Sequence, residues 1–187
     1  MNHKLILIVF TLISILSCRK IESEQNKRET KVGGCNDIDS PFYNDNIAYD
    51  DQSCTYAFTE RYEISYHPEK DGGSNWDPLV YTDADLVFRI KEQGSADWLF
   101  ESTTKEDQAH NVPAIWAAPE SIKLLNKNYE WELHDEDNGS SDDFVAGGTF
   151  NPIGKSREGN QDDKQIEITD DTGGTQLILY YTVKQEI

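Results

Sequence analysis

Five carboxylates are packed into one short connection between two apolar segments of the sequence. Asp135, Glu136 and Asp137 follow directly after the first segment, and Asp142 and Asp143 precede the second. Asp135 and Asp137 are two residues apart, so at the end of a strand their side chains point to the same side. Asp143 lies where the chain returns, so it can come back beside them. Converging carboxylates repel one another unless a cation with many oxygen ligands lies between them, and Ca²⁺ is the usual occupant.

The same residues also fit a simpler interpretation, an acidic and well-solvated hairpin loop on an acidic protein. A second acidic segment upstream favours the cation. There Asp77 opens a loop, and Asp83 and Asp85 stand at the beginning of an alternating apolar segment. Loops at the same end of a β-sandwich collect ligands from distant parts of the sequence, so both acidic segments can serve one site.

The elements that must position these carboxylates read as short β-strands. Tyr129, Trp131 and Leu133 alternate with polar residues, which is the period-two pattern of a half-buried strand. Spacers rich in Gly, Asp, Asn and Pro separate the apolar runs, and no segment shows a convincing helical stripe, so the pattern predicts an all-β protein with the strand spacing of a sandwich. The expected strands are Ala57–Tyr66, Asp85–Lys91, Asp97–Thr103, Ser121–Leu125, Tyr129–His134, Phe144–Phe150, Gln165–Thr169 and Thr175–Val183.

Composition agrees with one folded domain that attracts cations. The chain has 187 residues, 36% hydrophobic and 11% aromatic, which is enough for one domain of ordinary size plus a tail. Its net charge of −18 disfavours binding to nucleic acid or to a bare anionic membrane, and it favours cation binding.

The first 17 residues are typical of a signal peptide, because Lys4 precedes an apolar run that is too short to span a bilayer. The run ends in Ile15-Leu16-Ser17-Cys18, which resembles a bacterial lipobox. That resemblance implies a diacylglycerol on the Cys18 thiol after cleavage; the alternative is an ordinary signal peptide with Cys18 incidental. We expect residues 18–33 to be a flexible, lipid-anchored tether. The expected location is outside the cytoplasm, at the outer membrane or cell surface of a Gram-negative bacterium.

The chain has three cysteines, an awkward number for a secreted protein. If Cys18 is lipidated, Cys35 and Cys54 are left to pair. The segment between them resembles a short repeat of bacterial secreted and surface proteins, which implies a disulfide-closed module over residues 34–55. A loop this small cannot form a hydrophobic core of its own, so the disulfide would stabilise its fold. The residues that carry the resemblance are Gly34-Cys35-Asn36-Asp37 and Asp50-Asp51-Gln52-Ser53-Cys54.

Residues 56–187 resemble a C2-type domain. The resemblance rests on the aspartates before the strand at 85–91, on Pro113-Ala114-Ile115-Trp116, and on the pattern W-x-L-x-D-x-D-x5-D-F over residues 131–144. It implies an eight-stranded antiparallel β-sandwich whose loops at one end bind calcium and often phospholipid.

The C2 resemblance also implies a set of calcium ligands. Asp77 and Asp85 match the first loop, with Asp83 as a rival because the strand opens Asp85-Leu86-Val87 rather than Asp-Pro-Tyr. The later loop contributes the other three. The implied metal ligands are Asp77, Asp83, Asp85, Asp135, Asp137 and Asp143.

Carboxylates of this number supply enough oxygens for Ca²⁺, whereas the histidines are scattered and lack thiolate partners, which disfavours zinc. We therefore expect a calcium-binding surface module that contacts a phospholipid, a glycan or a surface protein. The alternative is an adhesion or assembly module in which calcium is only structural. No nucleophile elbow, phosphate loop or cofactor fingerprint is present in the sequence, so we expect no enzyme.

Overall fold

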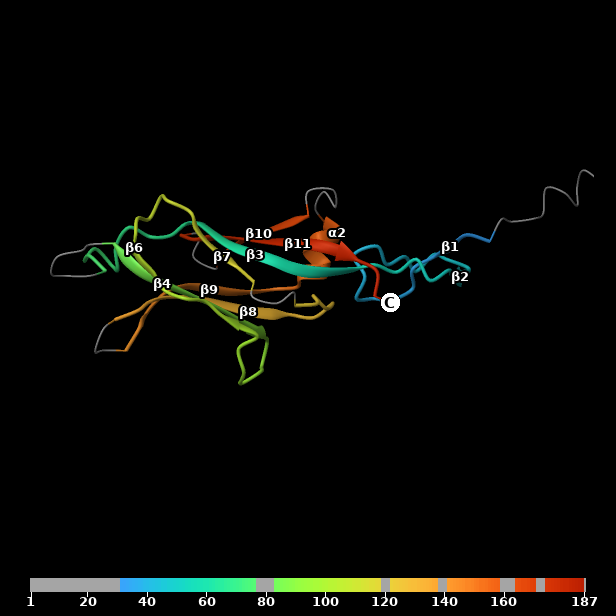
Figure 1. The fold of residues 1–187 in the computed structure, drawn as a ribbon, viewed down its shortest axis with the longest axis horizontal. Coiled ribbons are helices and arrows are strands. Elements are labelled where there is room, and N and C mark those ends of the chain that lie inside the picture. Colours follow the sequence, from blue (N-terminus) through green and yellow to red (C-terminus); the bar gives the residue numbers. More distant parts are fainter. Residues whose placement is uncertain are drawn as a thin grey trace, which may run out of the picture.

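The computed structural model describes residues 31–76, 83–118, 122–137, 141–158, 164–170 and 174–186. Within them the chain forms two antiparallel β-sheets that face each other, with a small disulfide-closed segment at one end (Figure 1). The all-β sandwich predicted from the sequence is confirmed.

One sheet has four strands in the order β10-β11-β3-β7, and each neighbouring pair is antiparallel. Its strands are β3 (Tyr56–Tyr66), β7 (Ala114–Ala117), β10 (Gln165–Thr169) and β11 (Gln176–Lys184). The other sheet has the order β5-β4-β8-β9, and β6 also pairs with β4. Its strands are β4 (Ala84–Glu92), β5 (Phe100–Glu101), β6 (Lys105–Gln108), β8 (Tyr129–Asp135) and β9 (Asp143–Phe150).

The core lies between the two sheets because apolar and polar residues alternate along their strands. In β8, Trp131 and Leu133 are fully buried while Glu130 and Glu132 beside them stay partly exposed. Aromatic rings fill the centre: the Tyr62 ring centroid lies 4.9 Å from that of Phe88 and 4.9 Å from that of Phe100. Such pairs add about 0.5–1.5 kcal/mol each beyond the burial of their surface.

The strand count differs from the eight expected. Of the expected strand Ser121–Leu125, the described residues 122–125 form an isolated bridge, Phe58 to Lys123, rather than a strand. The adjacent stretch Ala114–Ala117 is a strand instead, and the expected strand Asp97–Thr103 is reduced to the two-residue β5. The described residues of the sandwich therefore contain nine strands.

A short helix, α2 (Pro152–Glu158), connects β9 to β10. Asn151 caps it, because its side-chain oxygen accepts a hydrogen bond of 2.9 Å from the Gly154 amide. Pro152 then occupies the first helical position, where its missing N–H costs nothing. This helix was not expected from the sequence, since seven residues are too few to show an apolar stripe.

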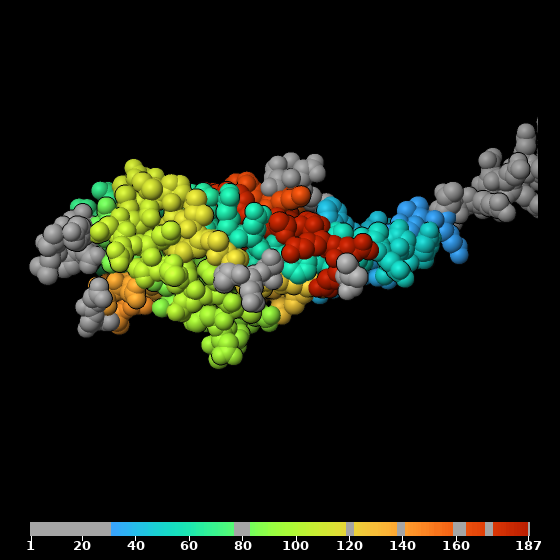
Figure 2. Space-filling view, viewed as in Figure 1, coloured from blue at the N-terminus to red at the C-terminus, as the bar shows by residue number. Residues whose placement is uncertain are grey.

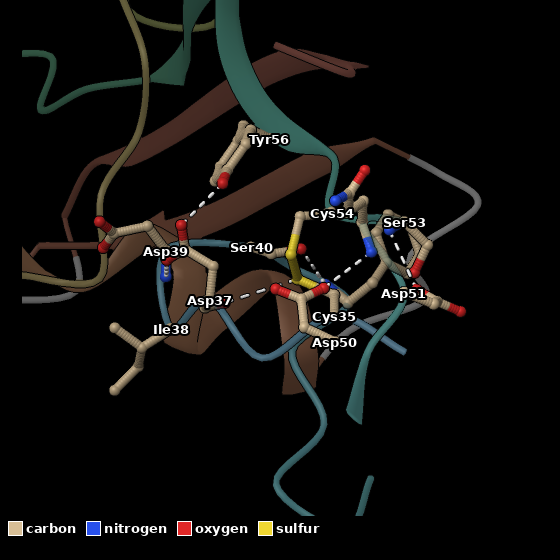
Figure 3. The surroundings of a disulfide bond; sticks show 12 residues. Cys35, Asp37, Ile38, Asp39, Ser40, Asp50, Asp51, Ser53, Cys54 and Tyr56 are labelled. Carbon is tan, nitrogen blue, oxygen red and sulfur yellow. Dashed lines mark hydrogen bonds between the residues drawn. A yellow bond between two sulfur atoms is a disulfide. The ribbon is translucent and has the colours of Figure 1, made fainter. Parts of the chain in front are cut away.

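The segment closed by Cys35 and Cys54 packs on the sandwich. The predicted disulfide is confirmed, with an S–S distance of 2.07 Å (Figure 3). Tyr56 donates a hydrogen bond of 2.7 Å to Asp37, also visible in Figure 3. From α2, Arg157 donates to the carbonyl oxygens of Ile38 and Ser40 at 2.7 and 2.6 Å. Two very short strands, β1 (Gly33–Gly34) and β2 (Tyr49–Asp50), pair in parallel within this segment.

The segment lies at the opposite end of the molecule from the acidic residues at the start of β4 and the end of β8. Strand β4 begins and β8 ends at one end of the sandwich, whereas β1, β2 and the C-terminus lie at the other (Figure 1). In the space-filling view the segment, in blue and cyan, projects from the body (Figure 2). No helix in the described residues is long and apolar enough to cross a membrane.

Candidate cation-binding end of the sandwich

Two carboxylates of the connection between residues 135 and 143 meet where β8 ends and β9 begins. In the register of these strands Asp135 lies directly opposite Asp143, so their side chains share one face of the sheet. On its other side Asp135 lies opposite Leu86 of β4, a core residue. Asp135 therefore stands on the core-facing side at the rim of the sandwich.

Asp135 is almost completely buried, with 1% of its surface exposed. Its Oδ1 atom accepts a hydrogen bond of 2.5 Å from the main-chain amide of Asp85. The next residue, Glu136, donates its amide to the Asp85 carbonyl oxygen at 2.8 Å. These two bonds hold the end of β8 beside the beginning of β4, and they bring the two acidic segments of the sequence together.

Asp85 points away from the core and contacts the edge strand β6. Its Oδ1 atom accepts a hydrogen bond of 2.7 Å from the amide of Asp107. Asp107 has a φ of 51°, in the left-handed region that aspartate tolerates better than most residues. The bond fixes one oxygen of Asp85 and leaves Oδ2 available as a ligand.

Asp142 and Asp143 have different surroundings although they are neighbours in sequence. Asp142 accepts a hydrogen bond of 3.1 Å from Arg89, whose guanidinium also binds Glu101 at 2.9 Å. Asp143 is exposed and faces the Asp135 side. The positive charge of Arg89 therefore compensates Asp142 and not Asp143.

The other expected ligands are less closely gathered. Asp83 and Asp137 are half-buried. Asp77 lies outside the described residues. In the part of the chain that the structure describes, Asp83, Asp85, Asp137 and Asp143 form no ion pair with a cationic side chain. The described residues also contain no group of three His, Cys, Asp or Glu side chains arranged to hold a metal ion.

Two residues at this end were not among the expected ligands. Glu136 accepts a hydrogen bond from the Thr104 hydroxyl, which ties the acidic loop to the β5–β6 connection. Asp107 reaches the site from β6, a strand that the sequence did not predict. A carboxylate pattern alone could have indicated Glu136, but no signal in the sequence pointed to Asp107, because its place depends on the pairing of β6 with β4.

A buried histidine lies near the same end. His67 is 4% exposed, and its ring nitrogens lie 2.9 Å from the Pro68 carbonyl oxygen and 3.2 Å from that of Gln108. Burial lowers the pKa of His67, while the two carbonyl contacts and the charge of Asp83 oppose that shift. Residue 68 belongs to the segment before Asp77, so His67 joins that segment to β6.

The chemistry of these side chains fits a hard cation. Every expected ligand is a carboxylate, and carboxylate oxygens with main-chain carbonyls and water suit Ca²⁺. The fit is that of a site assembled around the ion rather than one formed in advance, because the ligands are not yet grouped within the described residues. Asp85 and Asp135 would provide the fixed part, since main-chain amides already hold them.

Comparisons with known proteins find structural likeness but no related sequence. No family model matches the sequence. No curated protein matches it either. Solved structures that the chain resembles include those of C2 domains. One described as the structure of a C2 domain is 17% identical, with a TM-score of 0.44, over 70% of this chain and 98% of that chain. BON1-C2B is 11% identical, with a TM-score of 0.45, over 72% and 95%.

A third similar structure is that of a C2 domain of plant Extended Synaptotagmin 1. It is 12% identical, with a TM-score of 0.39, over 71% of this chain and 95% of that chain. At these TM-scores and identities no ligand or activity follows from the likeness, and the functional argument rests on the residues of this chain.

Proposed function

We propose that the end of the sandwich carrying Asp83, Asp85, Asp135, Asp137 and Asp143 binds Ca²⁺, and that the bound ion mediates contact with a partner. The observation that supports this most is the pairing of Asp135 directly opposite Asp143, beside the main chain of Asp85. Asp77, which lies outside the described residues, is the sixth ligand in this proposal.

Electrostatic repulsion explains why this pairing favours a cation. Residues opposite each other on antiparallel strands have Cα atoms about 4.5–5.5 Å apart, and like charges placed so are destabilising. The cost increases when one of them is buried, as Asp135 is. A divalent cation between the two carboxylates turns this repulsion into attraction, and Asp83 and Asp137 can then close around it.

The bound ion would act as an electrostatic switch. Without metal, the uncompensated carboxylates at this end repel any anionic group. With Ca²⁺ bound, the rim becomes neutral or positive, so a phosphate or carboxylate of a partner can complete the coordination sphere. The partner would be a phospholipid, a glycan or a surface protein, and the role is binding without catalysis. The protein would work outside the cytoplasm, tethered through a lipid on Cys18.

The experiment measures binding to anionic liposomes and to a glycan array, each with millimolar Ca²⁺, with Mg²⁺, and with a chelator. We expect the protein to bind either the liposomes or a glycan only when Ca²⁺ is present. The Asp143→Asn variant should bind the same partner more weakly. Asp142→Asn is the matched control, because Arg89 already compensates Asp142. If Ca²⁺ stabilises the fold but no partner binds in its presence, the ion is only structural and the adhesion or assembly module is the better description. Equal binding in Ca²⁺ and chelator would contradict the proposal.

A further inference from the structure

Directly after β3, the ring of His67 is buried with both of its nitrogens facing main-chain carbonyl oxygens. Nδ1 lies 2.9 Å from the Pro68 oxygen, and Nε2 lies 3.2 Å from the Gln108 oxygen. A neutral imidazole has one N–H and can donate to only one of them, whereas an imidazolium donates to both. The protonated ring therefore has partners in the folded protein, although burial opposes its charge and lowers the pKa of His67.

The Pro68 carbonyl belongs to the segment that leads to one of the proposed calcium ligands. The Trp76 indole N–H donates a hydrogen bond of 3.0 Å to the same oxygen, and the Trp76 side chain is buried in the core. The residue after Trp76 in the sequence is Asp77. His67 and Trp76 thus share one acceptor just before this ligand.

The Gln108 carbonyl belongs to β6, the strand beside the beginning of β4. Gln108 pairs with Ala84, which stands between Asp83 and Asp85 in the sequence. The preceding residue of β6, Asp107, donates its amide to the Asp85 carboxylate at 2.7 Å. The buried ring therefore contacts the segment before the first proposed ligand and the strand that holds the next ones.

Two titratable groups act on this ring through their charge, and one of them is a proposed ligand. Beyond the larger effect of burial, His110 lowers the pKa of His67 and the negative charge of Asp83 raises it. In the described residues Asp83 forms no ion pair with the ring, so its charge acts from a greater distance. The other charged residues of the adjoining segments are exposed: Glu69, Lys70, Asp71, Glu106 and Asp107. A Ca²⁺ ion held by Asp83 would compensate that carboxylate and place positive charge near the ring.

We propose that a proton on His67 and Ca²⁺ at the acidic end oppose each other, so that acidification releases the ion. This inference rests on the proposed calcium function and adds its regulation. Linkage makes the effect reciprocal: the factor by which Ca²⁺ weakens proton binding is the factor by which the proton weakens Ca²⁺ binding. A unit charge roughly 12 Å away shifts a pKa by about one unit at an effective dielectric constant of about 20, which corresponds to about ten-fold in the dissociation constant.

The first test follows the ring proton signal of His67 by NMR in the full chain between pH 7.5 and 4.5. The titration is made with a chelator, with saturating Ca²⁺, and with sodium chloride at the same ionic strength. We expect Ca²⁺ to lower the midpoint by about one unit and sodium chloride to leave it unchanged. Ca²⁺ binding with an unchanged His67 midpoint would overturn this inference alone. Absence of saturable Ca²⁺ binding would overturn the proposed function, and this inference with it.

The second test measures the Ca²⁺ dissociation constant at pH 7.5 and pH 5 in wild type and in His67→Gln. Glutamine keeps a hydrogen-bonding side chain but cannot take up the proton. We expect acidification to raise the dissociation constant several-fold more in wild type than in this variant. His110→Gln and His134→Gln are the controls, and both should respond to pH as wild type does. An equal response in wild type and His67→Gln would assign the effect to the carboxylates and overturn the proposal, and its loss in His134→Gln alone would assign it to the ring beside Asp135 instead.

Discussion

Asp142 and Asp143 show how little the identity of a residue says about its role at this site. Both are loop carboxylates beside β9, yet Arg89 binds one of them and the other lies opposite a buried aspartate. The sequence predicted the convergence of Asp135 with Asp143 from spacing alone, and the register places them opposite each other. It did not distinguish Asp142, because the contact with Arg89 depends on which face of β4 and β9 each residue occupies.

The choice between Asp83 and Asp85 also depends on tertiary contacts. The Asp85 amide donates a hydrogen bond to the Asp135 carboxylate, and the Asp85 carboxylate accepts one from the Asp107 amide. Asp85 is therefore held in place at the acidic end. Asp83 lies just before β4, where strand periodicity no longer determines its direction. Sequence periodicity therefore predicted the position of the site but could not rank these two residues.

His67 gives a prediction about pH. Burial lowers the pKa of His67 below its ordinary value of 6.5, so the folded chain binds a proton there less readily than the unfolded chain. The free energy of unfolding should therefore fall as the pH drops below about 6.5, in addition to any effect of the carboxylates.

The measurement compares urea unfolding of wild type and His67→Gln between pH 7.5 and 5. The difference between the two proteins should shrink on acidification, because only wild type loses the contribution of a neutral, buried His67. His110→Gln is the control, since the His110 side chain is not buried as His67 is. A difference that stays constant over this range would show that His67 does not titrate differently on folding.

At the scale of elements, long strands were predictable and short ones were not. β3, β4, β8, β9, β10 and β11 follow alternating or apolar runs and agree with the expected ranges within a few residues. β5, β6 and β7 have two to four residues each, too short for a period to show. These strands form only because they pair with β4 or β3, and that pairing depends on the tertiary fold rather than on the local sequence.

The disulfide gives a prediction at the same scale. The double variant Cys35→Ser/Cys54→Ser should lower the free energy of unfolding by about 3 kcal/mol. Without the disulfide the unfolded chain has more conformational freedom, and this stabilises the unfolded state. The contacts of Arg157 and Tyr56 with the segment would be weakened with it.

Guanidinium unfolding of the double variant and of oxidised wild type provides the measurement, and limited proteolysis between residues 36 and 53 locates the change. Wild type in reducing buffer should behave like the variant. An unchanged midpoint in both would mean that the packing contacts alone hold the segment.

At the scale of the whole molecule, the two ends of the sandwich carry different features. The disulfide-closed segment and the C-terminus lie at one end, and the start of β4 and the end of β8, with their acidic residues, lie at the other (Figure 1). A tether before residue 33 would therefore join the molecule at the end away from the proposed calcium site. If Cys18 is lipidated as proposed, the proposed calcium site would face away from the anchoring membrane.

The anchor itself gives a prediction. Cys18→Ser should move the protein from the membrane fraction to the soluble extracytoplasmic fraction, because a thiol is the group that receives the lipid. Circular dichroism of the released variant should match that of wild type. Retention of the variant in the membrane at the wild-type level would contradict the lipoprotein interpretation.

Calcium should also change the stability of the whole chain. An ion that binds only the folded state adds about 2.7 kcal/mol at 100 times its dissociation constant. Ca²⁺ should thus raise the melting temperature, and Mg²⁺ should raise it less, because Mg²⁺ requires a tighter octahedral site. Asp137→Asn should remove most of this shift, and without calcium it should melt no lower than wild type, since one repulsion is relieved. The same calcium shift in both proteins would exclude Asp137 from the site.

The most direct test of the central claim is a calcium titration of the full chain followed by amide chemical shifts in NMR spectra. Extracellular modules bind Ca²⁺ with dissociation constants of roughly 10⁻⁴–10⁻³ M, so saturation is expected in the millimolar range. We predict shifts at the amides of residues 83–85, 107, 135–137 and 143 in wild type and in Asp142→Asn, and their loss in Asp143→Asn. No saturable shift at these amides up to tens of millimolar Ca²⁺, or an unchanged titration in Asp143→Asn, would contradict the claim that this end of the sandwich is a calcium site.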